Sequence, residues 1–322
     1  MDPLLILGAF GVGIVVGLTG MGGGALMTPM LVLLFGVPPL TAVSSDLVAS
    51  AVMKPAGALV HLKQKTVALR LVGLLCIGSV PAAFCGVLII RSFGDDARIE
   101  EGVQFALGCA LILAAVLLTV RAYLRLAEKA RSRDGHGAPL PTARPSVVAR
   151  PAATIALGAA GGLLVGLTSV GSGSMIIIGL MVLYRGLRAN QLVGTDLVQA
   201  VPLVASAAIA HALYGDLEMS ITWPLLIGSI PGAAAGAWIS ARMSGGYVRR
   251  ILAFVLLASG LKMLGLSTAV TGVVLAAALV IAPVMWMLIR RHHGFPALVL
   301  TERRRRRKRA LDRAARAEHP SG

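Results

Sequence analysis

The sequence predicts an all-α, polytopic membrane protein with two inverted repeats of about five segments each and one further C-terminal span. The first observation is composition, because 57% of the 322 residues are apolar and the mean hydropathy is +0.83. The second is that apolar residues form uncharged blocks, among them 71–90, 103–120 and 267–289. Runs of about 20 apolar residues are typical of membrane spans. The third is an internal duplication whose loops carry opposite charge.

Each half of the chain divides into five hydrophobic segments. In the first half they are 3–18, 24–36, 41–60, 71–90 and 103–120, and in the second half 152–167, 173–184, 192–213, 221–240 and 251–266. Segments 24–36 and 173–184 are short for a full crossing, which makes half-helices or re-entrant segments an alternative to full spans. The predicted organisation is a first membrane repeat (1–120), a basic cytoplasmic linker (121–151), a second membrane repeat (152–266), an extra span (267–289) and a basic cytoplasmic tail (290–322).

The duplication shows in four matching motifs. At an offset of 149 or 150 residues the pairs are Gly17-Leu18-Thr19 with Gly166-Leu167-Thr168, Ser45-Asp46-Leu47 with Thr195-Asp196-Leu197, His61 with His211, and Gly78-Ser79-Val80-Pro81 with Gly228-Ser229-Ile230-Pro231. A fixed period of this kind indicates a repeated structural unit.

Loop charges indicate that the second repeat is turned over. Loop 61–70 contains three basic residues, whereas its partner 214–220 contains two acidic residues and no basic one. Loop 241–250 contains three arginines, whereas its partner 91–98 is balanced. Since cytoplasmic loops carry an excess of Lys and Arg, we expect the N-terminus outside and both linker and C-terminus inside, in the inner (plasma) membrane. Many secondary transporters have this architecture.

The net charge of +16 lies mainly in two segments beside predicted spans. Residues 121–150 contribute +5 and residues 290–322 contribute +8. We interpret both as topology anchors, expect the run 303–309 to contact anionic membrane lipid, and expect no nucleic-acid partner. The three cysteines, Cys76, Cys85 and Cys109, fall inside spans without metal-site spacing and are interpreted as small apolar residues.

Two glycine-rich stretches interrupt the apolar pattern at equivalent places, GLTGMGGG at 17–24 and GLTSVGSG at 166–173. In inverted-repeat transporters, paired interruptions of this kind point to broken helices at the substrate site. Free backbone N–H groups and hydroxyls there would suit an anion. The substrate-binding candidates are Thr19, Gly20, Gly22, Gly23, Gly24, Lys54, Thr168, Ser169, Gly171, Ser172 and Gly173. Close helix packing through small residues is the alternative reading of these glycines.

Asp46 and Asp196 are the acidic residues that fall inside hydrophobic segments. A carboxylate within the membrane is a functional candidate, so we assign these two residues, with the neighbouring Ser45 and Thr195, to the binding of a coupling proton or Na⁺. Helix capping is the alternative, because each Asp lies near the start of its segment. Asp46, Ser50, Lys54 and His61 fall on one face of the predicted helix. Lys54 lies well over a turn before its segment ends, so we expect it to pair with the substrate anion or with an Asp, and snorkelling is the alternative.

His61 and His211 end the third segment of each repeat, on opposite membrane faces in the expected topology. They are candidates for a gate or a proton relay. The alternative is an interfacial polar side chain satisfied by a neighbouring loop.

The paired glycine-rich stretches, the Ser45-Asp46-Leu47 and Thr195-Asp196-Leu197 triplets and the two Gly-Ser-(Val/Ile)-Pro motifs resemble the TauE/SafE family of sulfite exporters. The resemblance covers the chain to about residue 266. It implies a permease for sulfite, sulfonates or related small anions, often working in export. The family often has Thr-Ser-Leu where this chain has the two Asp-containing triplets.

These observations together predict a secondary transporter for a small anion, sulfite or an organosulfonate, that exports its substrate and is coupled to protons or Na⁺. An anion channel, or an accessory membrane protein that assists assembly of a partner complex, is the alternative. The sequence contains no P-loop, HExxH zinc motif or nucleophile elbow, so we expect no enzyme activity, no catalytic residue, no cofactor and no metal site.

Overall fold

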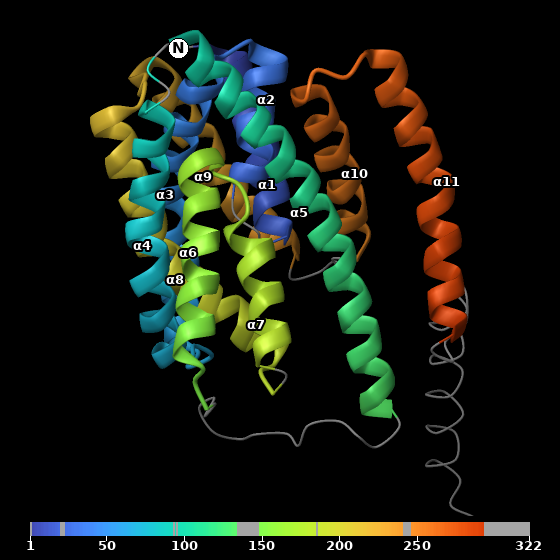
Figure 1. Cartoon of the computed structure of the whole chain (residues 1–322). Helices are drawn as coiled ribbons and strands as arrows, with labels where there is room; N and C mark the ends of the chain where they lie inside the picture. The colour runs from blue at the N-terminus through green and yellow to red at the C-terminus, as the bar shows by residue number, and fades with distance from the viewer. Residues whose placement is uncertain are drawn as a thin grey trace, which may run out of the picture. The chain divides into compact units, whose positions relative to one another are not determined.

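The computed structural model describes residues 2–19, 23–92, 94, 96–133, 148–184, 186–240 and 246–292. Within these ranges the chain forms helices and loops and contains no β-strand. The first half contains α1 (Pro3–Thr19), α2 (Gly24–Phe35), α3 (Pro39–Lys63), α4 (Leu69–Arg91) and α5 (Asp96–Arg133). The second half contains α6 (Pro151–Thr168), the π-helix η1 (Ser172–Ile176), α7 (Ile177–Leu183), α8 (Ala189–Tyr214), α9 (Met219–Ser240) and α10 (Gly246–Met263), followed by α11 (Thr268–His292) (Figure 1).

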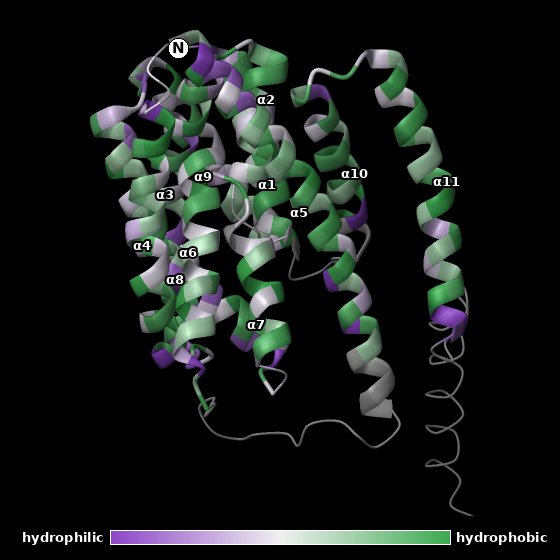
Figure 2. Cartoon of the chain, viewed as in Figure 1, coloured by the Kyte–Doolittle hydropathy of each residue, from purple (hydrophilic) through white to green (hydrophobic). Residues whose placement is uncertain are grey.

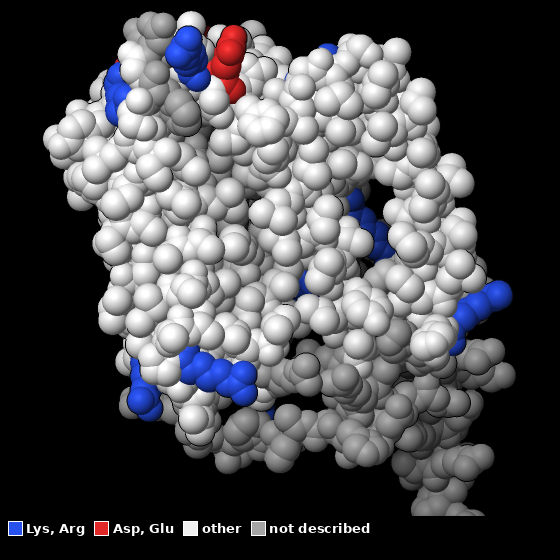
Figure 3. Space-filling view, viewed as in Figure 1, with Lys and Arg blue, Asp and Glu red and all other residues white. Residues whose placement is uncertain are grey.

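Six of the described helices are long and apolar enough to cross a membrane, namely α3, α4, α5, α6, α8 and α11. Hydrophobic residues cover most of their length, and hydrophilic residues gather towards helix ends (Figure 2). On the face seen in Figure 3, charged side chains likewise lie mainly near the two ends of the helices. The prediction of an all-α, polytopic membrane protein is confirmed.

By internal contacts the chain divides into two compact units. The larger comprises residues 1–121 and 139–271, and the smaller comprises residues 122–138 and 272–322. The smaller unit holds most of α11, an apolar helix with basic residues in its last turn, where they complement the negative end of the helix dipole. The candidate site lies wholly in the larger unit.

Every expected hydrophobic segment lies on a helix, and α5 differs most from its expected extent. We expected that segment to end at residue 120, but α5 continues to Arg133. The added stretch is rich in Ala, Leu, Arg, Glu and Lys, which are good helix formers whether or not they are apolar.

The helices on either side of each glycine-rich stretch pair as a hairpin. A Cβ on Gly8 of α1 would lie 3.0 Å from the sulfur of Met30, in the middle of α2, and 3.4 Å from the ring of Phe35, at its far end, so α2 runs back along α1. In the second half a Cβ on Gly161 of α6 would lie 2.9 Å from Ile176, and Gly179 of α7 meets Leu157. The sequence left full spans and re-entrant segments open, and the structure shows hairpins whose second arms, α2 and η1 with α7, are short.

The two repeats interlock, because the first helix of each packs against the fourth helix of the other, α1 with α9 and α6 with α4. The partners touch through glycine faces. A Cβ on Gly158, Gly162 or Gly166 of α6 would overlap backbone carbonyls of α4, and Gly228, Gly232 and Gly236 of α9 meet carbonyls of α1 in the same way. Small residues allow such close approach of membrane helices. Close packing is therefore the role of Gly17 and Gly166, which open the two glycine-rich stretches.

The two halves are inverted relative to each other. Helix α2 returns along α1, so α3 runs in the same sense as α1 and α4 in the opposite sense. Gly158, Gly162 and Gly166 of α6 meet Leu75, Ser79 and Ala83 of α4 in that order. Residue numbers therefore increase in the same direction along both helices, which makes them parallel. Hence α6 runs opposite to α1, and in Figure 1 the chain enters these helices from opposite ends.

Candidate functional site

The two hairpin tips meet in the interior of the larger unit. A Cβ on Gly24, at the start of α2, would overlap the backbone carbonyl of Ser169, so only glycine allows this approach. Ser169 ends α6 in the left-handed region with φ of 56°, and Gly171 follows with φ of 113° before the chain re-enters a helix. Glycine adopts such angles without steric cost, which explains why the sequence places it at this turn.

A small cavity opens beside the meeting point. Its volume is about 20 Å³, enough for one or two water molecules. The lining combines polar and glycine residues from the hairpin tips and α3 with apolar side chains from α5 and α10: Gly24, Ala25, Lys54, Ala114, Leu118, Ser169, Gly171, Gly173, Ser174 and Leu256. Five of the predicted substrate-binding residues therefore share one cavity.

Lys54 brings positive charge to this cavity from the middle of α3. Its side chain is 8% exposed, and it interacts electrostatically with Asp196 and with Asp46. A buried charge is tolerated only where opposite charge or hydrogen bonds compensate it, which the two carboxylates do. Of the four residues on the predicted polar face of this helix, Asp46, Ser50 and Lys54 are buried, whereas His61 is half-buried.

Asp46 lies behind Ser169 and is fully buried. One carboxylate oxygen, Oδ2, accepts hydrogen bonds from the hydroxyl of Ser169 at 2.5 Å and from the hydroxyl of Thr28 at 3.2 Å. The other oxygen, Oδ1, has no hydrogen-bond partner among the described residues, and neither do the hydroxyls of Ser45 and Ser50. The bond to Ser169 joins two residues 123 positions apart, one from each repeat.

Asp196 occupies the equivalent position in the second repeat but has different neighbours. Its Oδ1 accepts a hydrogen bond from Gln199 at 3.4 Å, and Gln199 in turn accepts one from Ser79 of α4 at 3.3 Å. Lys54 and Arg121 supply positive charge nearby. The adjacent Thr195 accepts the backbone N–H of Ala68 at 3.1 Å, so its hydroxyl ties the start of α4 to α8.

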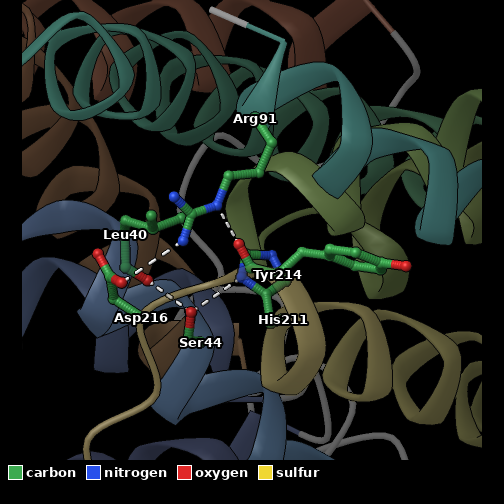
Figure 4. A network of polar contacts seen from close by, with 6 residues as sticks. All are labelled: Leu40, Ser44, Arg91, His211, Tyr214 and Asp216. Carbon is green, nitrogen blue, oxygen red and sulfur yellow. Dashed lines mark hydrogen bonds and ion pairs between the residues drawn. The ribbon is translucent and has the colours of Figure 1, made fainter. Parts of the chain in front are cut away.

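His211 is fully buried and joins three helices. Its Nδ1 lies 2.9 Å from the hydroxyl of Ser44 on α3, and its Nε2 lies 2.9 Å from the carbonyl oxygen of Gly166 on α6. Figure 4 shows the contact between His211 and Ser44 beside Arg91, which donates to the carbonyl of Tyr214 and pairs with Asp216 at 3.5 Å. The network joins α3, α4, α6 and α8 at one end of the bundle. Its member Ser44 is two residues before Asp46 on α3.

His61 occupies the equivalent position at the other end and is half-buried. Its Nδ1 lies 2.9 Å from the hydroxyl of Thr66 in the following loop. A Cβ on Gly194, the repeat counterpart of Ser44, would lie 3.0 Å from the same nitrogen. The two histidines thus face equivalent positions of the other repeat, where His211 meets the hydroxyl of Ser44 and His61 meets Gly194, which has no side chain.

The remaining predicted site residues either lie away from the cavity or fall outside the residues that the structure describes. Thr19 and Thr168 donate to carbonyls of their own helices, Val15 at 2.8 Å and Leu164 at 2.7 Å. Gly23 faces Asp46 and Ser50 rather than the cavity. Gly20, Gly22 and the side chain of Ser172 lie outside the described residues.

Sequence reasoning missed two polar neighbours of the carboxylates, Thr28 and Gln199. Gln199 stands three residues after Asp196, on the same helix face, and a glutamine within a span is a signal that helical periodicity could have used. Thr28 has no such signal, because its contact with Asp46 depends on the return of α2 along α1.

Comparisons with known proteins agree with this architecture. The sequence model of the sulfite exporter TauE/SafE family matches residues 5–263. The chain is 39% identical over 262 residues to a probable membrane transporter protein YjnA of Bacillus subtilis (strain 168), covering 81% of this chain and 98% of that protein. It is 28% identical over 235 residues to YdhB of the same organism, also named a probable membrane transporter protein, covering 73% of this chain and 88% of that one.

No solved structure matches the chain. The family match spans both repeats and includes the two hairpin tips, both membrane aspartates and Lys54. The chain belongs to the sulfite exporter TauE/SafE family.

Proposed function

We propose that this membrane transporter is a secondary carrier that exports a small anion, sulfite or an organosulfonate, with flux coupled to protons or Na⁺. The observation that carries the proposal is the meeting of both hairpin tips at a cavity lined by Lys54. Gly171 and Gly173 leave the backbone open to a close approach by an oxyanion, and Ser169 and Ser174 add hydroxyls. These groups suit a compact anion with several oxygen atoms.

The size of the cavity favours a carrier over a channel. A space for one or two waters is smaller than a sulfite ion, so the helices around it must separate before substrate enters. Apolar side chains of α5 and α10 complete the lining on the side away from the hairpins. A small site between interlocked repeats suits alternating access, because one repeat can rock against the other around it.

We make two further proposals, on orientation in the membrane and on a contact with lipid. We place the N-terminus outside and the linker and tail in the cytoplasm of a cell with this protein in its plasma membrane. We also propose that the basic run 303–309, which lies outside the described residues, contacts anionic lipid headgroups.

The test is transport by purified protein in liposomes loaded with a pH-sensitive dye. Labelled sulfite, sulfoacetate, thiosulfate and sulfate are offered under imposed proton or Na⁺ gradients, with protein-free liposomes as the control. We expect saturable flux of at least one sulfur oxyanion and accumulation against its gradient. Flux without accumulation under any gradient would indicate a channel. No flux from folded protein would contradict the permease and favour the accessory role.

The double substitution Asp46→Asn with Asp196→Asn is compared in the same liposomes. We expect anion flux that no longer responds to the cation gradient, because neither position can then carry a removable proton or a negative charge. An unchanged response would show that the carboxylates serve only the packing of α3 and α8.

A further inference from the structure

We propose that Asp46 takes up the coupling proton, and that the single hydroxyl hydrogen of Ser169 links this event to anion binding in the neighbouring cavity. The inference rests on the proposed function and deepens it, because it separates the roles of two aspartates that occupy equivalent repeat positions. It also names the residue through which the proton and anion sites communicate.

Ser169 stands between the two sites. Its side chain lines the cavity that contains Lys54, and its Oγ donates to Asp46 Oδ2 at 2.5 Å. A serine hydroxyl has one hydrogen to donate, and a short bond to an ionised carboxylate is among the strong ones. While Asp46 is ionised, that hydrogen is held away from the cavity. An anion there would meet the lone pairs of Ser169 and the negative charge behind it.

A proton completes the surroundings of Asp46. Oδ2 already accepts two hydroxyl bonds, whereas Oδ1 and the hydroxyl of Ser50 are buried without a partner among the described residues. Both of these atoms face Gly23, since a Cβ there would lie 3.4 Å from Oδ1 and 3.6 Å from Ser50 Oγ. Protonated Oδ1 becomes a donor, and Ser50 on the next turn of α3 offers an acceptor on the same face. A sodium ion would need several more oxygen ligands at this point.

Asp196 lacks the same connection. The repeat counterpart of Ser169 is Gly20, which has no hydroxyl. Asp196 instead accepts a hydrogen bond from Gln199 and is the stronger of the two electrostatic partners of Lys54. We therefore assign Asp196 to holding Lys54 in the cavity and reserve proton uptake for Asp46.

Few other charged groups face Asp46. Lys54 on the same helix attracts its ionised form, and Lys54 also interacts electrostatically with Asp196 on α8. His211 of α8 reaches Ser44, two residues before Asp46. The described parts of α2, of α9 and of the segment around Ser169 bring no titratable side chain.

The cycle then follows from charge and hydrogen counting. One proton binds Asp46 Oδ1, the carboxyl becomes neutral, and the Ser169 hydrogen turns from Oδ2 to an oxygen of the anion beside Lys54. One proton and one anion cross together and leave together, and no bond other than the O–H bond at Asp46 forms or breaks. For a divalent anion the pair carries a net charge of −1, so an inside-negative membrane potential drives it outward.

The deciding experiment counts protons per anion in liposomes. Sulfoacetate and thiosulfate are the probes, since neither carries a group that titrates near neutral pH, and dye and label are read together. Ser169→Gly is the test variant, because glycine tolerates φ of 56° and removes only the hydroxymethyl group. Ser174→Ala is the matched control, since it deletes a cavity hydroxyl, and among the described residues the hydrogen bonds of the two aspartates come from Thr28, Ser169 and Gln199. Asp46→Asn and Asp196→Asn are measured singly.

We expect the wild type and Ser174→Ala to move protons with the anion at the same ratio, Ser174→Ala with slower flux. Ser169→Gly and Asp46→Asn are expected to lose proton movement while keeping anion flux, and Asp196→Asn to keep the ratio with weaker anion binding. A wild-type ratio in Ser169→Gly, or anion flux without protons in the wild type, would overturn the inference and leave the permease standing. No anion flux in the wild type would overturn the proposed function and this inference with it.

Discussion

Lys54 is the residue on which both proposed sites depend, because it lines the cavity and interacts electrostatically with two carboxylates. We predict that Lys54→Gln lowers anion affinity by about 10- to 100-fold, the equivalent of losing one charge-assisted hydrogen bond of roughly 1.5–3 kcal/mol. It should also destabilise the protein, since Asp196 is left buried without its main counter-charge. Binding is measured as the concentration dependence of sulfite uptake, and stability as the melting temperature in detergent.

A second substitution separates the two effects of Lys54. Asp196→Asn added to Lys54→Gln removes the uncompensated carboxylate, so the melting temperature should recover while anion affinity stays low. Recovery of both properties would mean that Lys54 serves the fold alone.

The two histidines differ in burial and in the number of their hydrogen-bond partners. His211 is fully buried between Ser44 and the Gly166 carbonyl, whereas His61 is half-buried with one side-chain contact to Thr66. We predict that His211→Ala costs about 1–3 kcal/mol, because it leaves buried polar groups unsatisfied, and that His61→Ala costs much less. Thermal unfolding of both variants checks this, and an equal loss would contradict it.

At the scale of helices, glycine faces hold the interlocked pairs together. We predict that Gly162→Ala in α6 and Gly232→Ala in α9 strongly destabilise the protein, since each added methyl group would overlap a backbone carbonyl, of Ser79 and of Phe10. Gly73→Ala in α4 is the matched control, because a Cβ there meets nothing within 4 Å, and it should be neutral or slightly stabilising. Melting temperatures that fall equally in all three would argue against the glycine faces.

The sequence predicts helices well here because membrane helices satisfy their own backbone hydrogen bonds and depend on local apolar runs. The segment expected at 24–36 is α2 at Gly24–Phe35, and the one expected at 71–90 is α4 at Leu69–Arg91. The direction in which α2 returns is not local information. It depends on contacts such as Gly8 with Met30, which apolar periodicity does not encode.

The same limit applies to the site. Repeat matching identifies Asp46, Asp196 and the glycine-rich stretches as candidates, since charge and glycine are unusual within a span. It cannot distinguish Ser169 from the other hydroxyls around it. Ser169 touches Asp46 because α6 packs on α4 and not on its own repeat's fourth helix, α9.

For the whole molecule, the duplication gives two repeats with the same arrangement of helices but different side chains at the candidate site. Lys54 corresponds to Val204 and Ser169 to Gly20. The positive charge at the site and the hydroxyl that links it to Asp46 therefore each come from one repeat alone. Interlocking makes this inequality useful, because the hairpin tip of one repeat meets the carboxylate of the other. Movement of one repeat against the other would change both sites together, as a coupled carrier requires.

Orientation in the membrane is the last prediction and belongs to the whole chain. Loop 61–70 and its repeat partner 214–220 should lie on opposite sides, the first in the cytoplasm because of its three basic residues. Single cysteines replace the exposed Gln64 and Glu218 in a background that lacks Cys76, Cys85 and Cys109, and a membrane-impermeant thiol reagent is added to intact cells. Glu218→Cys should react at once, and Gln64→Cys only after the membrane is opened. Reaction of both from one side would contradict the inverted repeats, whereas exchange of the two results would contradict the orientation alone.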